Sequence, residues 1–322
     1  MSCSMAMAMS INSVVFFAFV FLTVQICLGT QGTNRHSDDH PNWQVLPTEE
    51  CGYGAMSDRI IGGKEATLGQ FPWIARLGYQ IKKNKPKIFY LCAGSLINRW
   101  YVVTANHCFL DLLGDTLKQV RLGENFLKEQ SDCENEICAP PVQDIDVQRL
   151  IRFEEYEGER SITYGDIGLI KLARPAEFHD FVIPICLPRG DVVNRINDYH
   201  LTHGTSVEVA GWGTTTAEVN RIPNKLMYVH MPVVNLNVCK KNFPNNQIDE
   251  SQICVGIGEG KDSCVGDSGG PLMKPIVLDA PPKYFLFGIV SYGMKWCGVS
   301  AAIYTNVTHY MNWILDHMEP LD

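Results

Sequence analysis

Charged side chains are missing from the first 30 residues, which contain no Lys, Arg, Asp or Glu. Within that stretch, residues 14–28 (VVFFAFVFLTVQICL) form an apolar run that is short for a membrane span but typical of a signal-peptide core. The basic residue that usually precedes such a run is also absent, which leaves an uncleaved anchor as the alternative. We therefore expect residues 1–30 to be a signal peptide and the protein to be secreted.

A basic surplus is missing too, since 27 Lys and Arg stand against 35 Asp and Glu, a net charge of −8. Nucleic acids and anionic membranes bind basic surfaces, so neither is an expected partner. The sequence also has no low-complexity tract or internal repeat. Its 46% of hydrophobic residues suits a well-packed globular core.

The 12 cysteines include no CxxC pair and no clustered Cys/His spacing of the zinc-binding kind. Two of them, Cys3 and Cys27, lie in the expected signal peptide. The others form an even-numbered set, which in an exported chain favours disulfide bonds over a metal site.

The chain changes character at Arg59. Residues 31–59 are polar and acidic without apolar periodicity, which predicts an extended pro-segment, whereas an apolar, glycine-punctuated domain runs over residues 60–322. Short β-type runs predict an all-β sandwich or barrel. These runs cover residues 73–77, 101–105, 207–212 and 284–293.

One helix is predicted near the C-terminus, because apolar residues fall on one face there at helical spacing. They are Met311, Ile314, Leu315 and Met318. Either Asn306 or Thr308 could begin this helix.

Ser268 stands in an unusual string, GKDSCVGDSGGPL, between an acid and two glycines. A serine hydroxyl attacks a carbonyl only with a base and an orienting acid beside it. His107 in VVTANHC follows a β-type run, and Asp166 in YGDIGLIKL heads an apolar run. The chain thus holds candidates for all three members of a catalytic triad, in the order His, Asp, Ser.

These residues come with RIIGG, TANHC, GDIGLIKL, AGWG, KDSCVGDSGGPL, SYG and YTNV, in that order. The ordered set resembles the chymotrypsin-fold, trypsin-like serine proteases from Ile60 to about residue 318. The resemblance implies two packed six-stranded antiparallel Greek-key barrels and a C-terminal α-helix. It also implies a serine endopeptidase that needs no cofactor for catalysis.

The resemblance assigns a role to each candidate. Ser268 would be the nucleophile, His107 the base that carries its proton, and Asp166 the group that orients the ring. The backbone N–H groups of Gly266 and Ser268 would form the oxyanion hole.

The resemblance also implies a zymogen. Cleavage of the Arg59–Ile60 bond, by a trypsin-like activator or by the enzyme itself, would free the α-ammonium of Ile60. Asp267 would receive that charge and so order the oxyanion loop.

Substrate choice would depend on Asp262, which matches the acid that pairs with substrate Arg or Lys at the base of a trypsin-like pocket. Ser291 and Gly293, on either side of Tyr292, match the strand that binds the substrate backbone. The sequence AAIYT replaces the usual PGVYT and puts Ala302 where a pocket glycine is expected. Overpacking of this kind costs about 1–3 kcal/mol, so we expect a narrowed pocket.

The resemblance implies five disulfides. They are Cys51–Cys186, which would tether the pro-segment, Cys92–Cys108, Cys133–Cys138, Cys239–Cys254 and Cys264–Cys297. The Cys133–Cys138 loop further resembles the arthropod clip-domain proteases of the easter and prophenoloxidase-activating type. A clip domain needs six cysteines and residues 31–59 hold only Cys51, so we expect a relative that lacks this domain.

Three further signals are weaker. Glu124 in RLGEN matches the first ligand of a family calcium loop, and Asp132 or Glu134 could add carboxylates, with a solvated acidic loop as the alternative. Asn306 begins the sequon NVT, a candidate N-glycosylation site. Asn106 stands beside the histidine where alanine is usual.

We therefore predict a secreted serine endopeptidase zymogen, cleaved after Arg59, that hydrolyses protein substrates after Arg or Lys in an extracellular cascade. Expected partners are protein substrates, an upstream protease and a serpin-type inhibitor, and the chain is expected to be a monomer. The alternative is a catalytically weak homologue that acts as a binding or regulatory protein.

Overall fold

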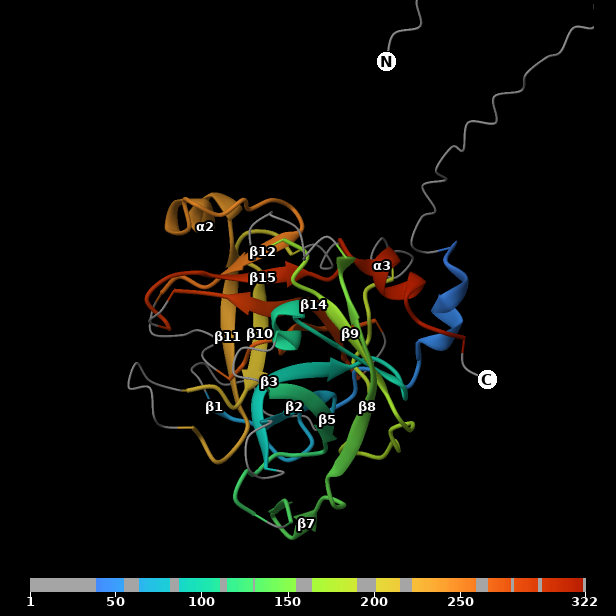
Figure 1. Cartoon of the computed structure of the whole chain (residues 1–322). Coiled ribbons are helices and arrows are strands. Elements are labelled where there is room, and N and C mark those ends of the chain that lie inside the picture. The colour runs from blue at the N-terminus through green and yellow to red at the C-terminus, as the bar shows by residue number, and fades with distance from the viewer. Residues whose placement is uncertain are drawn as a thin grey trace, which may run out of the picture. The chain divides into compact units, whose positions relative to one another are not determined.

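The computed structural model describes residues 39–54, 64–81, 87–110, 115–129, 131–154, 164–189, 201–214, 222–258, 266–278, 281–294 and 297–320. All of them belong to one compact unit, residues 35–322. Most regular structure in this unit is β-strand, as Figure 1 shows.

Six antiparallel strands close into a first barrel in the order β2-β3-β4-β9-β8-β5. In that order they are β2 (Ile74–Ile81), β3 (Ile88–Leu96), β4 (Tyr101–Thr104), β9 (Gly168–Leu172), β8 (Gln143–Arg152) and β5 (Asp115–Leu122). β4 is buried along its whole length, which explains why its sequence, YVVT, is uninterrupted by charge.

A second barrel forms from β11-β10-β13-β14-β15-β12, and the additional pairing of β11 with β12 closes it. In that order the strands are β11 (Met227–Val234), β10 (Ser206–Gly211), β13 (Pro271–Ile276), β14 (Lys283–Tyr292), β15 (Ala302–Asn306) and β12 (Gln252–Val255). The expected pair of six-stranded antiparallel barrels is therefore confirmed.

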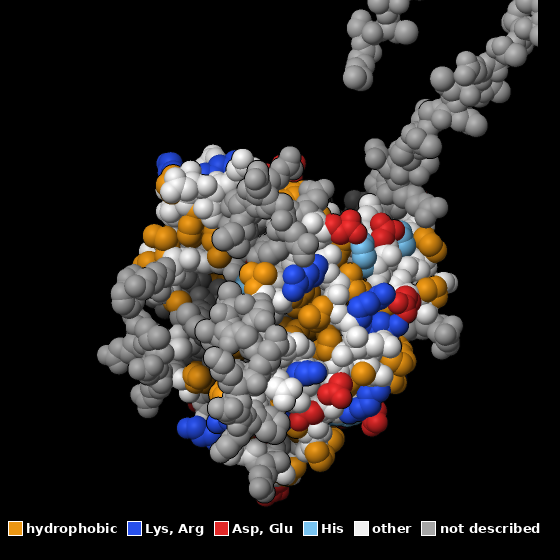
Figure 2. All heavy atoms as spheres, viewed as in Figure 1, with side chains coloured by type: hydrophobic (Ala, Val, Ile, Leu, Met, Phe, Trp, Pro, Cys, Tyr) orange, Lys and Arg blue, Asp and Glu red, His pale blue; other side chains and the backbone are white. Residues whose placement is uncertain are grey.

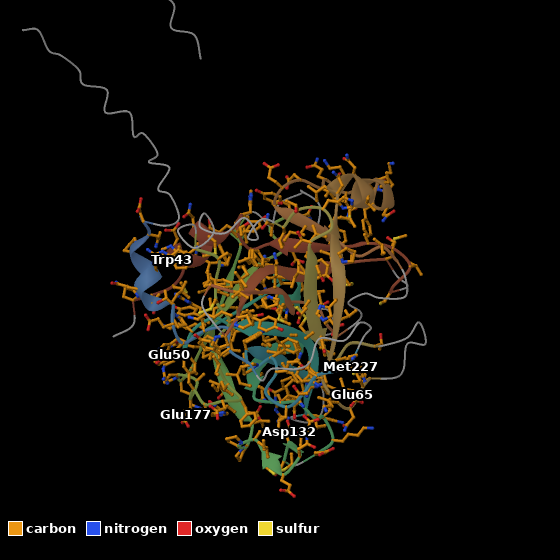
Figure 3. The ribbon with its side chains drawn as sticks, turned by 180° about the vertical axis from the view of Figure 1, so that it is seen from behind. Trp43, Glu50, Glu65, Asp132, Glu177 and Met227 are labelled. Atoms are coloured by element: carbon orange, nitrogen blue, oxygen red, sulfur yellow. A yellow bond between two sulfur atoms is a disulfide. The ribbon has the colours of Figure 1, made fainter. Side chains whose placement is uncertain are left out.

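The remaining elements are short. β1 (Lys64–Glu65) pairs with β11, so that Glu65 lies opposite Met227, as Figure 3 shows. β6 (Cys133–Glu134) and β7 (Ile137–Cys138) form a hairpin at the foot of the first barrel, near Asp132 in Figure 3. The helical segments are η2 (Pro41–Val45), η3 (Asn106–Phe109), α2 (Leu236–Asn242) and α3 (Met311–Asp316).

The C-terminal helix α3 forms with the expected face inward. The four residues of that face are at most 2% exposed, and they are Met311, Ile314, Leu315 and Met318. The expected start at Asn306 or Thr308 is wrong, because the helix begins at Met311. The Asn306 carboxamide oxygen instead accepts from the backbone N–H and hydroxyl of Thr308, at 3.2 and 2.6 Å, so it closes a turn.

Helix α2 was not predicted from sequence. Its seven residues include only one that is buried, Cys239, so no apolar stripe marks it. Asn235 caps it by accepting the backbone N–H of Asn237 at 2.9 Å.

Four disulfides join described cysteines, and each pairing is one that the resemblance implied. They are Cys51–Cys186, Cys92–Cys108, Cys133–Cys138 and Cys239–Cys254. Cys297 is also disulfide-bonded, but Cys264, its expected partner, lies outside the described residues.

The segment at residues 39–54 differs from the extended, polar pro-segment that the sequence predicted. Trp43, Val45 and Leu46 are only 5–6% exposed and belong to the main hydrophobic core. Figure 3 shows Trp43 on η2 at the side of the unit. Because η2 is a five-residue 3₁₀ helix, it has no helical or strand periodicity for sequence analysis to detect.

Asn42 fixes this segment to α3. Its side-chain Nδ2 donates to the backbone oxygens of Leu315 and Met318, both at 2.8 Å, at the C-terminal end of the helix. The Leu315 carbonyl also accepts the backbone N–H of Met318, but at 3.4 Å, so Asn42 adds a shorter hydrogen bond at the end of the helix, where carbonyls lack the usual helical partners. Nearby, His40 Nε2 lies 2.9 Å from Asp316 Oδ1.

No helix in the described part of the chain is long and apolar enough to cross a membrane. On the face drawn in Figure 2, basic and acidic side chains are interspersed among polar and apolar ones.

Replacing Asn42 by alanine should remove both side-chain hydrogen bonds to these carbonyls and lower the free energy of unfolding by about 1–3 kcal/mol. Thermal unfolding of the whole chain measures this. Asn237→Ala is the matched control, because only its backbone N–H is used, and it should change stability by less than about 0.5 kcal/mol. Equal stability of both variants would contradict the anchoring role of Asn42.

Candidate active site

Strand pairing in the first barrel brings His107 and Asp166 together. β4 and β9 are antiparallel, with Thr104 opposite Gly168. His107 follows β4 by a few residues and Asp166 precedes β9, so both lie at the same end of the barrel. Antiparallel register therefore explains how residues distant in sequence become neighbours.

The two side chains are joined by two hydrogen bonds. His107 Nδ1 lies 2.8 Å from Asp166 Oδ2, and the backbone N–H of His107 donates to Asp166 Oδ1 at 2.9 Å. Asp166 is buried, whereas the His107 side chain is 24% exposed. Since Nδ1 faces a carboxylate, it carries the proton, and Nε2 is left as the basic nitrogen.

The second barrel also contributes to this pair. Ser291, at the end of β14, donates its hydroxyl to Asp166 Oδ2 at 2.5 Å, and Thr305 Oγ1 on β15 donates to the backbone oxygen of Asp166 at 2.8 Å. Sequence analysis gave Ser291 only a substrate-strand role and did not single out Thr305. The motifs SYG and YTNV contain Ser291 and Thr305, but nothing in these motifs shows that both residues bind Asp166.

The environment shifts both pKa values. For Asp166, burial alone would raise the pKa, but the charge of His107 and the hydrogen bonds from His107 and Ser291 lower it below its ordinary value. For His107, burial alone would lower the pKa, but the charge and hydrogen bond of Asp166 raise it above its ordinary value of 6.5. These shifts favour an ionised Asp166 carboxylate next to a His107 ring that readily accepts a proton.

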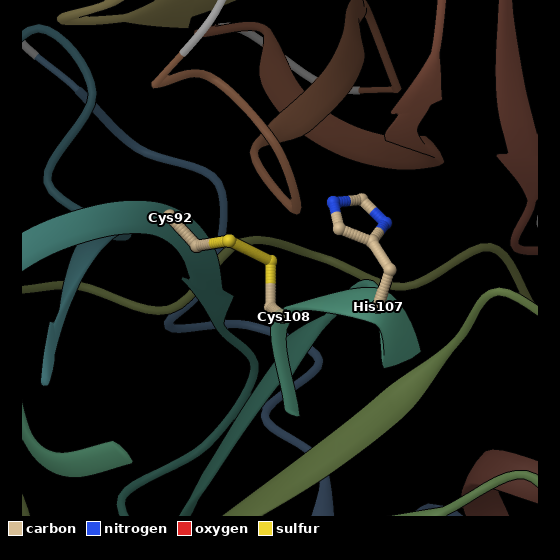
Figure 4. Close-up of side chains that lie close together, drawn as sticks. All are labelled: Cys92, His107 and Cys108. Atoms are coloured by element: carbon tan, nitrogen blue, oxygen red, sulfur yellow. A yellow bond between two sulfur atoms is a disulfide. The ribbon is translucent and has the colours of Figure 1, made fainter. Parts of the chain in front are cut away.

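A disulfide and hydrogen bonds hold the short helix η3 that carries His107. Cys108 is bonded to Cys92 on β3, beside the imidazole, as Figure 4 shows. Tyr79 donates its hydroxyl to the backbone oxygen of Cys108 at 2.8 Å. Among the described residues, Cys92, His107 and Cys108 are the group with metal-like spacing, but the two sulfurs are bonded to each other and so are not thiolate ligands.

Ser268 lies between the two barrels. Its backbone oxygen accepts the N–H of Ala93 on β3 at 2.8 Å, and the following N–H, of Gly269, donates to Val290 on β14 at 2.9 Å. A Cβ at Gly269 would lie 2.1 Å from Thr104 Oγ1, so only glycine permits this approach to the end of β4. The backbone of Ser268 is thereby held next to the segment that carries His107.

The hydroxyl of Ser268 makes no hydrogen bond to His107 in the part of the chain that the structure describes. Such bonds are often long before substrate binds and tighten in the complex. Ser268 is partly exposed, as is Gly266, whose φ of 103° is in the range that favours glycine.

The carboxylate of Asp267 packs against the AGWG motif. Its Oδ1 accepts the backbone N–H of Gly213 at 2.6 Å, and the residue is 8% exposed. A Cβ at Gly211 or Gly213 would lie 2.0 or 2.2 Å from one of its carboxylate oxygens. The two glycines therefore make room for this acid, a role that sequence analysis did not assign.

Only some of the expected specificity residues lie in the described part of the chain. Ser291 is buried and Gly293 is exposed at the end of β14. Ala302 begins β15, is 2% exposed and belongs to the apolar cluster inside the second barrel. Asp262 lies outside the described residues, as do Arg59 and Ile60.

Two further candidates make local contacts. Asn106, 1% exposed, places its Nδ2 3.5 Å from the backbone oxygen of Phe153. Asn306 donates its Nδ2 to the backbone oxygen of Glu250 at 2.9 Å, which leaves its second N–H site for a glycan.

The residues expected to bind calcium have other partners. Glu124 accepts from two arginines, Arg76 and Arg121. Asp132 Oδ2 accepts two backbone N–H groups, and Glu134 pairs with Lys225 at 2.6 Å. Cations and N–H donors on these oxygens do not fit a calcium site, which needs six to eight oxygen ligands. The calcium expectation is therefore not supported by the contacts.

Comparison with known proteins identifies the family. Residues 60–314 match the family described as Trypsin. The chain is 38% identical over 311 residues to "CLIP domain-containing serine protease HP8" of Bombyx mori, covering 93% of this chain and 79% of that one. It is 37% identical over 292 residues to "Spaetzle-processing enzyme" of Drosophila melanogaster, covering 86% and 70%.

A solved structure gives the same answer. The crystal structure of the Drosophila Grass clip serine protease of the Toll pathway superposes with a TM-score of 0.71 at 33% identity, covering 86% of this chain and 77% of that one. The fold, the arrangement around His107 and Asp166 and these relatives agree. The chain belongs to the trypsin family and is a serine endopeptidase.

Proposed function

We propose that the chain is a secreted zymogen that, once cut after Arg59, hydrolyses peptide bonds C-terminal to Arg or Lys in protein substrates. The observation that supports a catalytic role best is the buried Asp166 bonded to both the ring and the backbone of His107. A carboxylate in that position fixes the tautomer that leaves Nε2 free to accept a proton.

In the proposed reaction, Ser268 Oγ attacks the scissile carbonyl while His107 Nε2 takes its proton. The C–N bond breaks as His107 returns that proton to the leaving amine, and an acyl-enzyme remains on Ser268. A water molecule, deprotonated by His107, then attacks the ester carbonyl, and the bond to Ser268 Oγ breaks as His107 returns the proton to that oxygen, which releases the acid product. Asp166 stays ionised and stabilises the imidazolium in both halves.

Activation would act through the oxyanion loop. The N–H groups of Gly266 and Ser268 would bind the oxyanion, and the free ammonium of Ile60 would pair with Asp267. The Asp267 carboxylate accepts the N–H of Gly213 at 2.6 Å, so the ammonium of Ile60 would have to reach it beside the AGWG motif. Cys51–Cys186 and the packing of η2 would keep the cleaved pro-segment attached.

Specificity for Arg or Lys would come from Asp262 at the base of the pocket, with Ser291 and Gly293 on the substrate strand. Ala302, in place of the usual glycine, would narrow the space for a long side chain. This feature also keeps open the alternative of a catalytically weak homologue with a binding or regulatory role.

The biological setting is inferred from relatives. Their names include "Spaetzle-processing enzyme" and "Phenoloxidase-activating factor 1", and each name refers to another protein that is processed or activated. We propose a similar place in an extracellular proteolytic cascade, with an upstream protease as activator, a serpin-type inhibitor as regulator and a monomer as the active form. Residues 1–30 would direct export, and Asn306 would carry a glycan.

A fluorophosphonate probe should label Ser268 once Edman sequencing has verified an N-terminus at Ile60, because only an activated serine reacts with it. Ser268→Ala should abolish labelling. Ser206→Ala, an exposed serine on β10, is the matched control and should label normally. An absence of label on the cleaved wild-type protein would refute the catalytic assignment.

The rate constant kcat/KM for an Arg ester should rise with pH to a plateau, with a midpoint above about 6.5, because His107 must lose its proton to act as base and Asp166 raises its pKa. Asp166→Asn should lower kcat by about 10⁴-fold through the wrong tautomer. His179→Gln, which changes a histidine on the segment between β9 and β10, should leave the profile unchanged. A midpoint well below 6.5 in the wild type would argue against the assigned pair.

Replacing Ala302 by glycine should raise kcat/KM for Arg and Lys substrates by about 10–200-fold, the selectivity that one methyl group provides in a pocket. Ala301→Gly makes the same change at a neighbouring residue, also 2% exposed, and should not raise activity. Negligible wild-type activity that appears only in Ala302→Gly would favour the weak homologue. No gain in this variant would show that the methyl group does not restrict substrate.

A further inference from the structure

Two arginines lie side by side on adjacent strands of the first barrel. Arg76 on β2 and Arg121 on β5 are direct partners in the antiparallel register. Like charges directly opposite each other destabilise a sheet unless something neutralises them. Both guanidinium groups donate to one oxygen, Glu124 Oε2, at 3.2 and 3.0 Å. The Glu124 side chain is 5% exposed, so three charges meet largely out of water.

Other contacts fix both guanidinium planes. Arg76 Cζ lies 4.2 Å and Arg121 Cζ 5.0 Å from the centroid of the Tyr90 ring, within cation–π range. Arg121 also makes a bidentate pair with Asp144, with both N–O distances at 2.8 Å. Bidentate pairs of this kind are strong and specific in geometry. The positive charge around Glu124 is thus held rigidly in place.

The neighbouring acids, Asp132 and Glu134, also bind partners within the protein. Asp132 Oδ2 accepts the backbone N–H groups of Asn125 and Phe126 at 2.5 and 3.2 Å. Glu134 accepts from Lys225 and from the backbone N–H of Leu68, at 2.6 and 2.7 Å. These bonds order the loop from within the protein.

We propose that Arg76 and Arg121 replace a calcium ion in this chain. They neutralise Glu124, remove the need for a metal and hold the loop over residues 123–134, so that the stability of the protein does not depend on Ca²⁺. A divalent cation at Glu124 would have to displace both arginines or lie beside them, and their charge repels it.

The arginine pair also connects this loop to the region of Asp267. Arg76 Cζ lies 5.4 Å from the Trp212 ring, and Trp212 Nε1 donates to the backbone oxygen of Asn125 at 3.3 Å. The next residue, Gly213, binds Asp267. Arg76 is therefore a positioning residue for the AGWG segment, whose Gly213 binds the carboxylate of Asp267.

Thermal unfolding and calorimetric titration of the uncleaved full chain test this proposal without any dependence on catalytic activity. In about 5 mM CaCl₂, above the affinity range of extracellular calcium sites, the wild-type Tm should differ by less than about 1 °C from its value in EDTA. Calorimetry with CaCl₂ should show no saturable heat. A rise in Tm of more than about 2 °C, or a saturable binding isotherm, would overturn the proposal.

Variants test the role of the arginines directly. The double variant Arg76→Met, Arg121→Met should have a lower Tm in EDTA by about 5 °C or more, and CaCl₂ should restore part of the loss, since Glu124 then has neither arginine beside it. Arg149→Met, an exposed arginine on β8, is the control and should change Tm by about 1 °C or less.

Glu124→Gln provides a second measurement if the double variant does not fold. It leaves the two arginines opposed without a carboxylate, so it should lower Tm to the same extent with and without CaCl₂. A Glu124→Gln protein as stable as the wild type would show that the arginines need no such partner and would contradict the proposal.

Discussion

The antiparallel pairing of β4 with β9 is the constraint on which the site depends. Because Thr104 lies opposite Gly168, the chain leaving β4 and the chain entering β9 meet at one end of the barrel. A shift of one residue in this register would turn every side chain of the buried strand to the other face. The full burial of β4 makes such a shift costly. Core packing therefore sets the position of His107 relative to Asp166.

Neither barrel forms the site alone. The first supplies His107 and Asp166, and the second supplies the hydroxyl of Ser291 that donates to Asp166. A buried carboxylate is stable only when its oxygens accept enough hydrogen bonds, and here the donors come from both barrels. Ser268 bridges the same boundary through Ala93 and Val290. Loosening the interface between the two barrels would therefore remove some of the hydrogen bonds that stabilise the Asp166 carboxylate.

The family resemblance carried by the ordered motifs predicted the two-barrel fold and the four disulfides that join described cysteines. It did not predict the partners of Glu124, since a carboxylate in a motif shows what could bind and not what does. Arg121 stands in the same RLGEN motif, but Arg76 is distant in sequence and reaches Glu124 only because β2 pairs with β5. Helix α3 was found from its buried face, but its start was misplaced because Asn306 caps a turn as readily as a helix. Helix η2 has too few residues for any periodicity. Arg59, Asp262 and Cys264 lie outside the described residues.

The docking of η2 on α3 ties the beginning of the described chain to its end. Asn42 binds carbonyls of residues 315 and 318, and Trp43 fills the core beside them. Positions around 42–46 and 315–318 therefore form a single packing unit despite their separation in sequence. Substitutions accepted in one of these stretches during evolution would be limited by the other, so the two should covary among related chains. A tag or fusion placed directly after the last helix would likewise press on the docked N-terminal segment.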